Sequence, residues 1–586
     1  MIKLLRNLEK KDYITIILVA ILVVFSVFLD LRMPEYMSKI TKLVQTKDST
    51  MNEILISGGY MLICAILSLI CTIIVGYLTS LLSARFSKNI RRKIFAKVES
   101  FGISEIKKFK TSSLITRTTN DVTQIETLLA MGLQLLIKSP VMAIWALAKI
   151  IGKSGELSMV TGIGVIIIVI TNITIIRIVT PRFEKIQKLT DKINGVTREN
   201  ITGIRVVHAF NAEKFEEKRF DNVNNNITNI HLKVTKTFAL MDPMMNFVMH
   251  FQQLAIYIVG AILIIQSSMI DKINIFSNMV VFSSYGIQVI ISFLMLTFIF
   301  MVLPRARVSA NRINEVLEED ISIKSGTFKK ETKEKGIVEF KNVSFKYPDA
   351  DEYILKNISF KVEEGETIAF IGSTGSGKST LINLIPRLYD VTEGEVLVDN
   401  INVKEYDLKY LNNKIGYISQ TAVMFTGSVY ENVAYGDNGK KKPNLDKVKE
   451  AIKVAQATDF VEKMNDTYNS HIARGGTNIS GGQKQRLSIA RAIAKDPEIY
   501  IFDDSFSALD YKTDSTLRKE LKKYTKKSTN MIVAQRIGTI MNADKIMVLD
   551  KGECVGFGTH KELLKSCKVY KEIALSQLSE EELKNA

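Results

Sequence analysis

The sequence predicts an all-α membrane domain of six transmembrane helices, followed by an α/β domain that carries a phosphate-binding loop. Three observations lead to this fold class. Long apolar runs all lie before about residue 304. Some of these runs are separated by long basic loops. Beyond them, strand-like segments lead into a glycine-rich loop and an apolar helix, which is the order typical of phosphate-binding α/β domains.

The transmembrane helices are predicted from the length and hydropathy of the apolar runs. A helix needs about 20 mainly apolar residues to cross the hydrocarbon core of a bilayer. The stretches that meet this requirement lie at about 13–33, 54–84, 126–150, 156–180, 245–269 and 276–303. We therefore expect a membrane domain at residues 1–319, a charged linker at 320–336 and the α/β domain at 337–580.

Basic residues predict how the membrane domain is oriented. The loops after the second and fourth apolar runs are long and rich in Lys and Arg. The positive-inside rule places such loops, and hence both termini, in the cytoplasm. The formal net charge of +17 is explained by attraction to anionic lipid headgroups, so membrane lipids are expected partners and nucleic acid is not. A Lys-, Ile- and Asn-rich chain without an organelle-targeting segment indicates a bacterial plasma membrane.

Few polar side chains interrupt the apolar runs. A charge within the bilayer is costly, which makes each one a candidate for function. Asp30, Lys149 and Arg177 lie near predicted span ends, where side chains can reach water. The candidates for lining a substrate path are Lys138, His250, Gln252 and Gln253. The alternative interpretation is that these four are structural.

A phosphate-binding motif G-x-x-x-x-G-K-[ST] follows the apolar strand 367–371. It comprises Gly372, Ser373, Thr374, Gly375, Ser376, Gly377, Lys378 and Ser379, followed by Thr380. Glycines let backbone N–H groups surround phosphates, the lysine supplies positive charge and the serine hydroxyl reaches Mg²⁺. ATP and Mg²⁺ are therefore the predicted cofactors.

A second buried strand is predicted from "EIYIFDD" at 498–504. Its continuous apolar run is typical of a parallel strand covered on both faces. Asp503 ends this strand and is the expected metal-side carboxylate of a phosphate-loop ATPase.

Several segments resemble the ABC exporters whose helices cross between domains. These are "SSLITRTTNDV" (112–122), "ITGIRVVHAFNAEKFEEKRF" (201–220), "RARVSANRINEVLEE" (305–319) and "NISGGQKQRLSIARA" (478–492). The resemblance implies a short coupling helix in each of two cytoplasmic loops. It also implies a signature that acts on the partner's ATP, formed by Ser480, Gly481, Gly482 and Gln483. Ile479 stands where a leucine is usual in that signature.

The same resemblance assigns further nucleotide contacts. Tyr347 would stack on adenine, and Gln420 would contact Mg²⁺ and a coupling helix. The stretch from Ser507 to Asp510 would cross the interface between two ATPase domains.

Two departures from the family pattern concern catalysis. Asp504 stands at the position of the catalytic glutamate, and Gln535 stands at that of the switch histidine. An aspartate is one methylene shorter, and a glutamine cannot become a cation. Losing a well-placed base costs about 10²–10⁴-fold in rate. ATP binding should survive, whereas hydrolysis at this site should be slow.

The weakened site predicts an asymmetric assembly. The pattern resembles the degenerate-site subunit of bacterial heterodimeric multidrug exporters, in which a second half-transporter supplies the good catalytic residues. The expected function is ATP-driven export of amphiphilic drugs or lipids. The alternatives are a peptide exporter, a homodimeric exporter with slow sites, and a nucleotide-gated regulatory or channel subunit.

Overall fold

The computed structural model describes residues 1–46, 49–436 and 442–578, and the chain divides into two compact units. The first unit comprises Met1–Glu99 and Thr111–Glu319. The second comprises Ser100–Lys110 and the chain from Asp320 onward. The contacts of the segment Ser100–Lys110 thus assign it to the second unit, although it lies within the first 319 residues. The predicted domain end at residue 580 lies outside the described residues.

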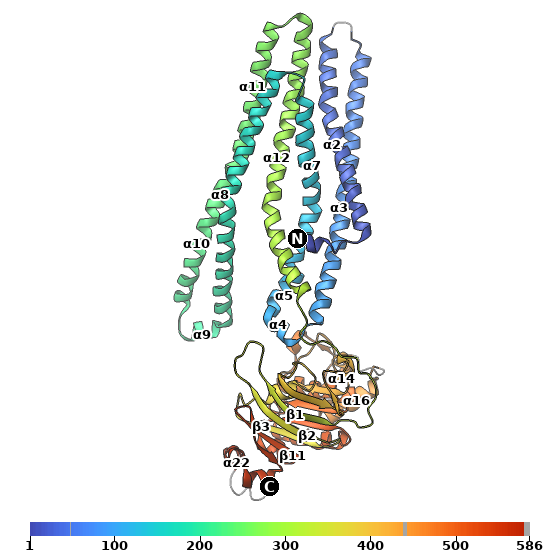
Figure 1. Ribbon diagram of the computed structural model, residues 1–586, viewed down its shortest axis with the longest axis vertical. Helices are drawn as coiled ribbons and strands as arrows, with labels where there is room; N and C mark the ends of the chain where they lie inside the picture. Colours follow the sequence, from blue (N-terminus) through green and yellow to red (C-terminus); the bar gives the residue numbers. More distant parts are fainter. Residues whose placement is uncertain (47–48, 437–441, 579–586) are drawn as a thin grey trace. The chain divides into compact units, whose positions relative to one another are not determined.

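The first unit is entirely helical (Figure 1). Its helices are α1 (Ile2–Leu5), α2 (Lys10–Gln45), α3 (Met51–Glu99), α5 (Thr111–Thr118), α6 (Asn120–Thr127), α7 (Leu133–Ile150), α8 (Gly155–Thr202), α9 (Ile204–Ala209), α10 (Glu213–Ala239), α11 (Met241–Gln266) and α12 (Met269–Glu318), with a π-helical turn at Leu128–Gly132. Within the described residues, six helical segments are long and apolar enough to cross a membrane. The predicted six-helix membrane domain is therefore confirmed.

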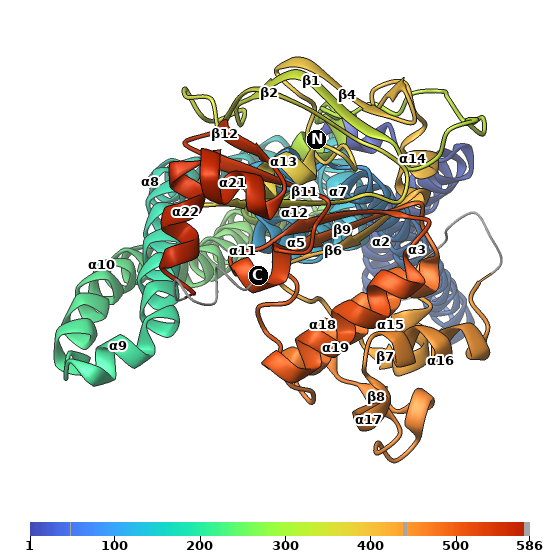
Figure 2. The same ribbon diagram turned by 90° about the horizontal axis from the view of Figure 1, so that it is seen from below.

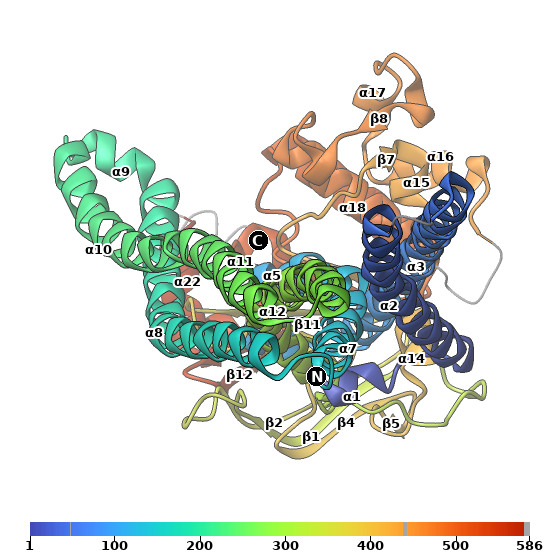
Figure 3. The same ribbon diagram turned by 90° about the horizontal axis from the view of Figure 1, so that it is seen from above.

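The long helices pair in the first unit, and their outer faces are apolar. Figures 1 and 3 show α2 beside α3, and α8 beside α10 with the short helix α9 joining them. On α3, large apolar side chains such as Ile63, Ile70 and Tyr77 are exposed. A soluble protein rarely exposes so long an apolar face, whereas lipid tails cover it readily. The segment 201–220, which resembles the second cytoplasmic loop of ABC exporters, contains the short helix α9.

Helix α2 is longer than its apolar run. The run predicts a span ending near residue 33, whereas α2 continues to Gln45 with Pro34 inside the helix. Backbone hydrogen bonding does not stop where hydropathy falls, so a helix can extend beyond the apolar span. Asp30 lies within the helix and near the predicted end of the span.

A buried side-chain amide lies between three helices of the membrane domain. Gln252 on α11 is 4% exposed, and neither its side-chain oxygen nor its nitrogen has a hydrogen-bond partner among the described residues. The amide lies against Gly164 of α8 and Gly286 of α12, where a Cβ would collide with it. Glycines at these two positions therefore make room for a polar group that gains no hydrogen bond.

We expect Gln252→Leu to stabilise the membrane domain by about 1–3 kcal/mol, because an unpaired buried amide carries a desolvation cost of this size. The measurement is the thermal unfolding midpoint of the purified chain in detergent. Gln253→Leu is the matched control, since Gln253 donates to the Ser283 hydroxyl at 3.2 Å and should not be improved by an apolar side chain. A lower midpoint for Gln252→Leu would contradict the expectation.

The second unit contains two large sheets (Figure 2). The antiparallel sheet has the order β2-β1-β4-β5, formed by β2 (Leu355–Val362), β1 (Val338–Phe345), β4 (Glu393–Val398) and β5 (Ile401–Asn402). The six-stranded sheet has the order β12-β11-β3-β10-β9-β6. Its strands are β12 (Glu553–Gly558), β11 (Lys545–Asp550), β3 (Thr367–Gly372), β10 (Thr529–Val533), β9 (Ile499–Asp503) and β6 (Ile415–Ile418). All but β12 run parallel, which confirms the α/β class.

Helices and short elements complete the second unit. They are α4 (Ile103–Phe109), α13 (Lys378–Asn383), α14 (Leu408–Asn413), α15 (Val429–Val433), α16 (Leu445–Val454), α17 (Thr458–Val461), α18 (Gly481–Lys495), α19 (Tyr511–Tyr524), α20 (Ile537–Ile540), α21 (His560–Ser566) and α22 (Lys568–Leu575), with a small ribbon of β7 (Gly427–Ser428) and β8 (His471–Ile472). The linker at 320–336 is held on this unit, because the Gly326 N–H donates to the Tyr406 carbonyl at 2.9 Å and the Phe328 ring meets Tyr406 edge-on.

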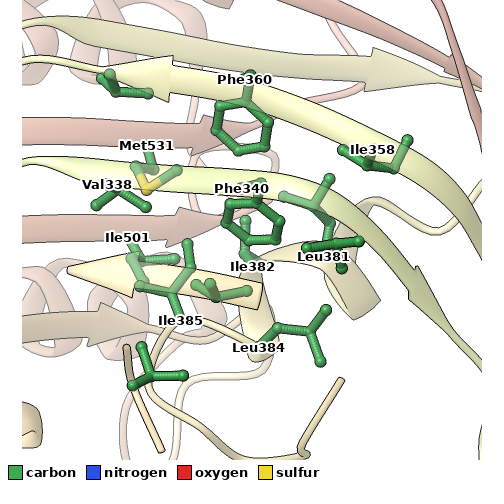
Figure 4. Close-up of a cluster of buried hydrophobic side chains, with 14 of the residues drawn as sticks. Val338, Phe340, Ile358, Phe360, Leu381, Ile382, Leu384, Ile385, Ile501 and Met531 are labelled. Carbon is green, nitrogen blue, oxygen red and sulfur yellow. The ribbon is translucent and has the colours of Figure 1, made fainter. Parts of the chain in front are cut away.

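The main core of the second unit lies where the antiparallel sheet meets α13 and the parallel strands. Phe340 and Phe360 stack with their ring centroids 4.6 Å apart, and Leu381 and Ile382 of α13 lie beside them (Figure 4). Fully buried aliphatic and aromatic side chains each contribute about 1.5–3 kcal/mol of transfer free energy. This core fixes α13, and with it the phosphate loop that precedes α13.

Candidate nucleotide-binding site

The predicted nucleotide residues gather at one edge of the parallel sheet. Gly372 ends β3 and Asp503 ends β9, while Gln420 follows β6 and Gln535 follows β10. These strands are neighbours in the sheet order. The carboxyl ends of parallel strands share one edge, and ligands of α/β domains bind there. Residues far apart in the sequence are therefore brought to one site.

The phosphate loop has the backbone geometry that its motif requires. Gly377 has φ +96°, which a side chain would strain, and a Cβ on Gly372 would collide with the Leu549 carbonyl. The Lys378 ammonium donates to the carbonyls of Gly372 at 2.8 Å and Ser373 at 2.7 Å. Burial lowers the pKa of Lys378, against the opposing charges of Asp504 and Asp503. The Lys378 ammonium thus lies against the backbone of the phosphate loop, which places its positive charge at the predicted phosphate site.

Ser379 and Asp503 form the metal side of the site. The Ser379 hydroxyl donates to Asp503 Oδ1 at 2.8 Å, and the Tyr417 hydroxyl lies 3.4 Å from Asp503 Oδ2. Burial raises the pKa of Asp503. Mg²⁺ prefers oxygen ligands and commonly takes one or two from protein, with the others from water and phosphate. The pair Ser379 and Asp503 fits this preference and would hold the ion, which would neutralise phosphate charge there.

Gln420, the third predicted metal ligand, contacts the neighbouring carboxylate. Its side-chain N–H donates to Asp504 Oδ2 at 3.3 Å. Among the residues that the structure describes, no group of three or more His, Cys, Asp and Glu side chains could hold a metal ion. The contact of Gln420 with Mg²⁺ stays a prediction.

Asp504 and Gln535 lie in direct contact. The Gln535 amide donates to Asp504 Oδ2 at 2.9 Å, so the same carboxylate oxygen accepts from both Gln535 and Gln420. Asp504 has φ +48°, an uncommon value for a side-chain-bearing residue. Burial, and then the charge of Asp503, raise the pKa of Asp504. One oxygen of the short Asp504 carboxylate is thus occupied by two neutral amides.

The segment that carries Gln535 is tied to the C-terminal part of the unit. The Gln577 amide donates to the Gln535 carbonyl at 2.7 Å, and its own oxygen accepts from the Ile537 N–H at 2.9 Å. Sequence reasoning missed Gln577, because nothing in its neighbourhood marks it. Two hydrogen bonds thus fix the backbone on either side of Arg536.

The signature residues form the start of α18. Ser480 caps this helix, since its hydroxyl accepts from the Gln483 N–H at 3.3 Å while the Ser480 N–H donates to Gln483 Oε1 at 2.8 Å. Ser480 and Gly481 are exposed. A capped helix start directs free N–H groups and a positive dipole end at an anion. The surface is therefore suited to the phosphate of a second ATPase domain.

The predicted interface stretch lies next to the catalytic position. The Ser507 hydroxyl donates to the Asp504 carbonyl at 2.9 Å. Asp510 caps α19 by accepting from the Thr513 N–H at 3.0 Å, and this hydrogen bond lowers the pKa of Asp510. A movement of the Ser507–Asp510 stretch would thus act on the backbone of Asp504.

The adenine side of the site contains a contact that the sequence did not reveal. The Tyr347 hydroxyl lies 2.9 Å from the Thr380 hydroxyl, and the Lys107 ammonium of α4 lies over the Tyr347 ring, 4.9 Å from its centroid. A hydrogen bond to Tyr389 raises the pKa of Lys107, which therefore stays charged. One face of the ring predicted to stack on adenine is occupied by a lysine.

We expect Lys107→Ala to tighten ATP binding by about 2–5-fold, because an exposed cation–π contact is worth about 0.5–1 kcal/mol and adenine would no longer compete with it. Titration of the purified chain with a fluorescent ATP analogue measures the affinity. Lys108→Ala is the matched control, since the Lys108 ammonium lies over Phe109 instead. Equal affinities for the two variants would show that Lys107 does not obstruct the adenine.

The four substrate-path candidates do not share one site. Lys138 on α7 pairs with Asp30 at 3.2 Å. Gln253 donates to Ser283, Gln252 is buried against glycines, and His250 is exposed on α11. Only Lys138 lines a pocket among those found in the described residues.

The fold and the site define a class: a membrane protein whose phosphate-loop ATPase domain is joined to six transmembrane helices. Family models agree with both halves. The model described as the ABC transporter transmembrane region matches residues 16–293, and the model described as ABC transporter matches residues 355–507.

Individual proteins resemble nearly the whole chain. An uncharacterized ABC transporter ATP-binding protein of Mycobacterium tuberculosis is 38% identical over 522 residues, covering 89% of this chain and 88% of that protein. The ATP-dependent lipid A-core flippase of Haemophilus influenzae is 32% identical over 509 residues, covering 86% and 85%. A solved bacterial Atm1-family ABC exporter with ATP bound has the same fold, with a TM-score of 0.81 at 21% identity over 97% of this chain and 100% of that one. The chain belongs to the ABC transporter family, as an exporter half-transporter with its own ATPase domain.

Proposed function

We propose that this chain exports amphiphilic small molecules, drugs or lipids, across a bacterial plasma membrane by alternating access, with both termini in the cytoplasm. The observation that supports a transporter is that one chain contains six segments able to span a membrane together with an ATPase domain. The names of relatives support the substrate class, because a lipid A-core flippase acts on an amphiphile. The exposed apolar faces of the long helices suit such cargo.

The chain's own ATP site is proposed to bind ATP tightly and to hydrolyse it slowly. The supporting observation is the contact of the Gln535 amide with Asp504 at 2.9 Å. Neither side chain can supply the long carboxylate and the cationic imidazole of a strong site. Lys378, Ser379 and Asp503 remain in place to bind the phosphates and the metal ion.

A heterodimer would place this chain's signature residues at a strong catalytic site, whereas a homodimer would repeat the weak site twice. The capped start of α18, with Ser480 and Gly481 exposed, is suited to complete the strong site of a second half-transporter. Two ATP molecules would draw the ATPase domains together and turn the cavity outward, and hydrolysis at the partner's site would reset it. A homodimer with two slow sites is the second candidate, and the intact signature of this chain is the observation that favours it.

The test is ATP turnover in lipid nanodiscs, first with this chain purified alone and then with the half-transporter encoded beside it. Near-zero turnover alone, and turnover stimulated by an amphiphilic drug in the co-purified pair, would support the asymmetric exporter. Full turnover by the chain alone would contradict the slow site and favour the homodimer. Stimulated turnover without movement of a fluorescent amphiphile into vesicles would favour a regulatory subunit.

A further inference from the structure

The membrane domain contains a pocket of about 500 Å³ that no motif predicts. Its lining comes from α2, α3, α7 and α12, all within one chain. Cavities of about 300–1,000 Å³ hold small-molecule ligands in proteins. Figure 3 shows these four helices as neighbours in the bundle.

One side of the pocket carries an ion pair. Asp30 of α2 pairs with Lys138 of α7 at 3.2 Å, and the two side chains are 18% and 20% exposed. The Ser68 hydroxyl donates to Asp30 Oδ1 at 2.5 Å. The Gln288 amide donates to the Asp30 carbonyl. The polar side therefore offers a cation and a carboxylate.

The rest of the pocket is lined largely by methionine. The methionines are Met33, Met37, Met61, Met142 and Met295. Methionine side chains are flexible and polarizable, so they adapt to apolar groups of different shape. Met37 and Ile291 on the lining are exposed, so an apolar chain can enter the pocket from outside this chain.

We propose that this pocket binds an amphiphile with a zwitterionic head, whose ammonium group pairs with Asp30 and whose phosphate or carboxylate group pairs with Lys138. The tail would lie along the methionines. This inference names the substrate class and its binding site, and it rests on the proposed export of amphiphiles.

Charge complementarity selects a zwitterion over a singly charged head. An anionic head alone would pair with Lys138 and leave Asp30 without its partner. A cationic head alone would do the reverse. Leaving one member of a partly buried ion pair unpaired is unfavourable. Only a head with both charges replaces the ion pair completely.

A neighbouring ion pair provides a matched control. Glu35 of α2 pairs with Lys149 of α7 at 2.7 Å, on the same two helices, yet neither residue lines the pocket. Removing that charge should leave binding in the pocket unchanged. A loss of binding on Asp30→Asn but not on Glu35→Gln would therefore separate the pocket from a general effect of charge on the helices.

The single tryptophan of the chain can report binding in the pocket by its fluorescence. Trp145 is its single tryptophan and follows Met142 by one turn on α7. Brominated acyl chains quench tryptophan fluorescence only at short range. The full chain would be placed in phosphatidylglycerol nanodiscs without nucleotide, and short-chain brominated phosphatidylethanolamine would be added. Brominated phosphatidylglycerol and a brominated alkyltrimethylammonium are the comparison probes.

We expect the phosphatidylethanolamine probe to quench Trp145 at about tenfold lower concentration than either comparison probe, as one charge-assisted contact implies. Asp30→Asn and Lys138→Gln should abolish this preference, and Glu35→Gln should keep it. The exchanged pair Asp30→Lys with Lys138→Asp should restore it, even if either single variant fails to fold. Equal quenching by all probes, or a preference that survives Asp30→Asn, would overturn the proposal. Selective quenching without transport of the probe would instead contradict the proposed export and leave the binding site standing.

Discussion

We expect the replacement of Asp504 with Glu and Gln535 with His to raise ATP hydrolysis at this chain's own site by about 10²–10⁴-fold, the range that a well-placed general base contributes. Glutamate extends the carboxylate by one methylene beyond the position where two neutral amides now hold Asp504 Oδ2. Histidine removes one of those amides and supplies a group that can carry positive charge near the phosphate.

The measurement is phosphate release by the chain purified alone in nanodiscs, so that no other subunit contributes. Asp459→Glu is the control for the same lengthening of a carboxylate, because Asp459 pairs with Arg486 outside the site. ATP affinity should stay within about 3-fold, since Lys378 and the phosphate loop are unaltered. Unchanged turnover in the double variant would contradict the proposal that Asp504 and Gln535 make hydrolysis at this site slow.

Gly481→Asp should lower the ATP turnover of the assembled transporter by about 10²–10³-fold, the cost of losing stabilising donors at a reacting phosphate. Apart from the adjacent residues and the backbone of α18 itself, no atom of the described residues lies within 4 Å of a Cβ at Gly481, so the side chain has room within this chain. An aspartate at the start of α18 also interacts favourably with the helix dipole. The substitution therefore keeps or raises the thermal unfolding midpoint while it places negative charge against the partner's ATP.

Stability and activity are thus expected to move in opposite directions at this position. Gly481→Ala is the control, with nearly normal turnover, because it fills the same space without charge. Both variants are compared by thermal unfolding and by ATP turnover of the co-purified pair. Full activity of Gly481→Asp would mean that the start of α18 faces no phosphate.

The sequence predicts most of the nucleotide site because its residues are marked locally. Gly372, Lys378 and Asp503 follow apolar strands, and parallel strands bring their carboxyl ends together whatever lies between them. The same reasoning could not find Lys107 beside Tyr347, since α4 meets the ATPase domain through tertiary contacts that leave no periodic pattern. It also did not reveal the hydrogen bond from the Gln420 amide to Asp504.

In the membrane domain, hydropathy predicts which segments are helices but not how their polar residues pair. The ion pair between Asp30 and Lys138 joins α2 to α7. The apolar run of α2 ends before the helix does. Gln252 gave the same signal as Lys138, a polar group in an apolar run. Only the neighbouring glycines show that it is packed without a partner.

The double hydrogen bond of Gln577 has a practical meaning for anyone who shortens this chain. Because Gln577 holds the backbone on both sides of Arg536, a truncation that removes it releases the Gln535 segment, although no motif lies near that end of the protein. A protease that trims the chain before Gln577 would leave every phosphate-loop residue intact and still loosen the turn that contacts Asp504. Affinity tags are therefore best appended beyond Leu578 rather than used to replace the last helix.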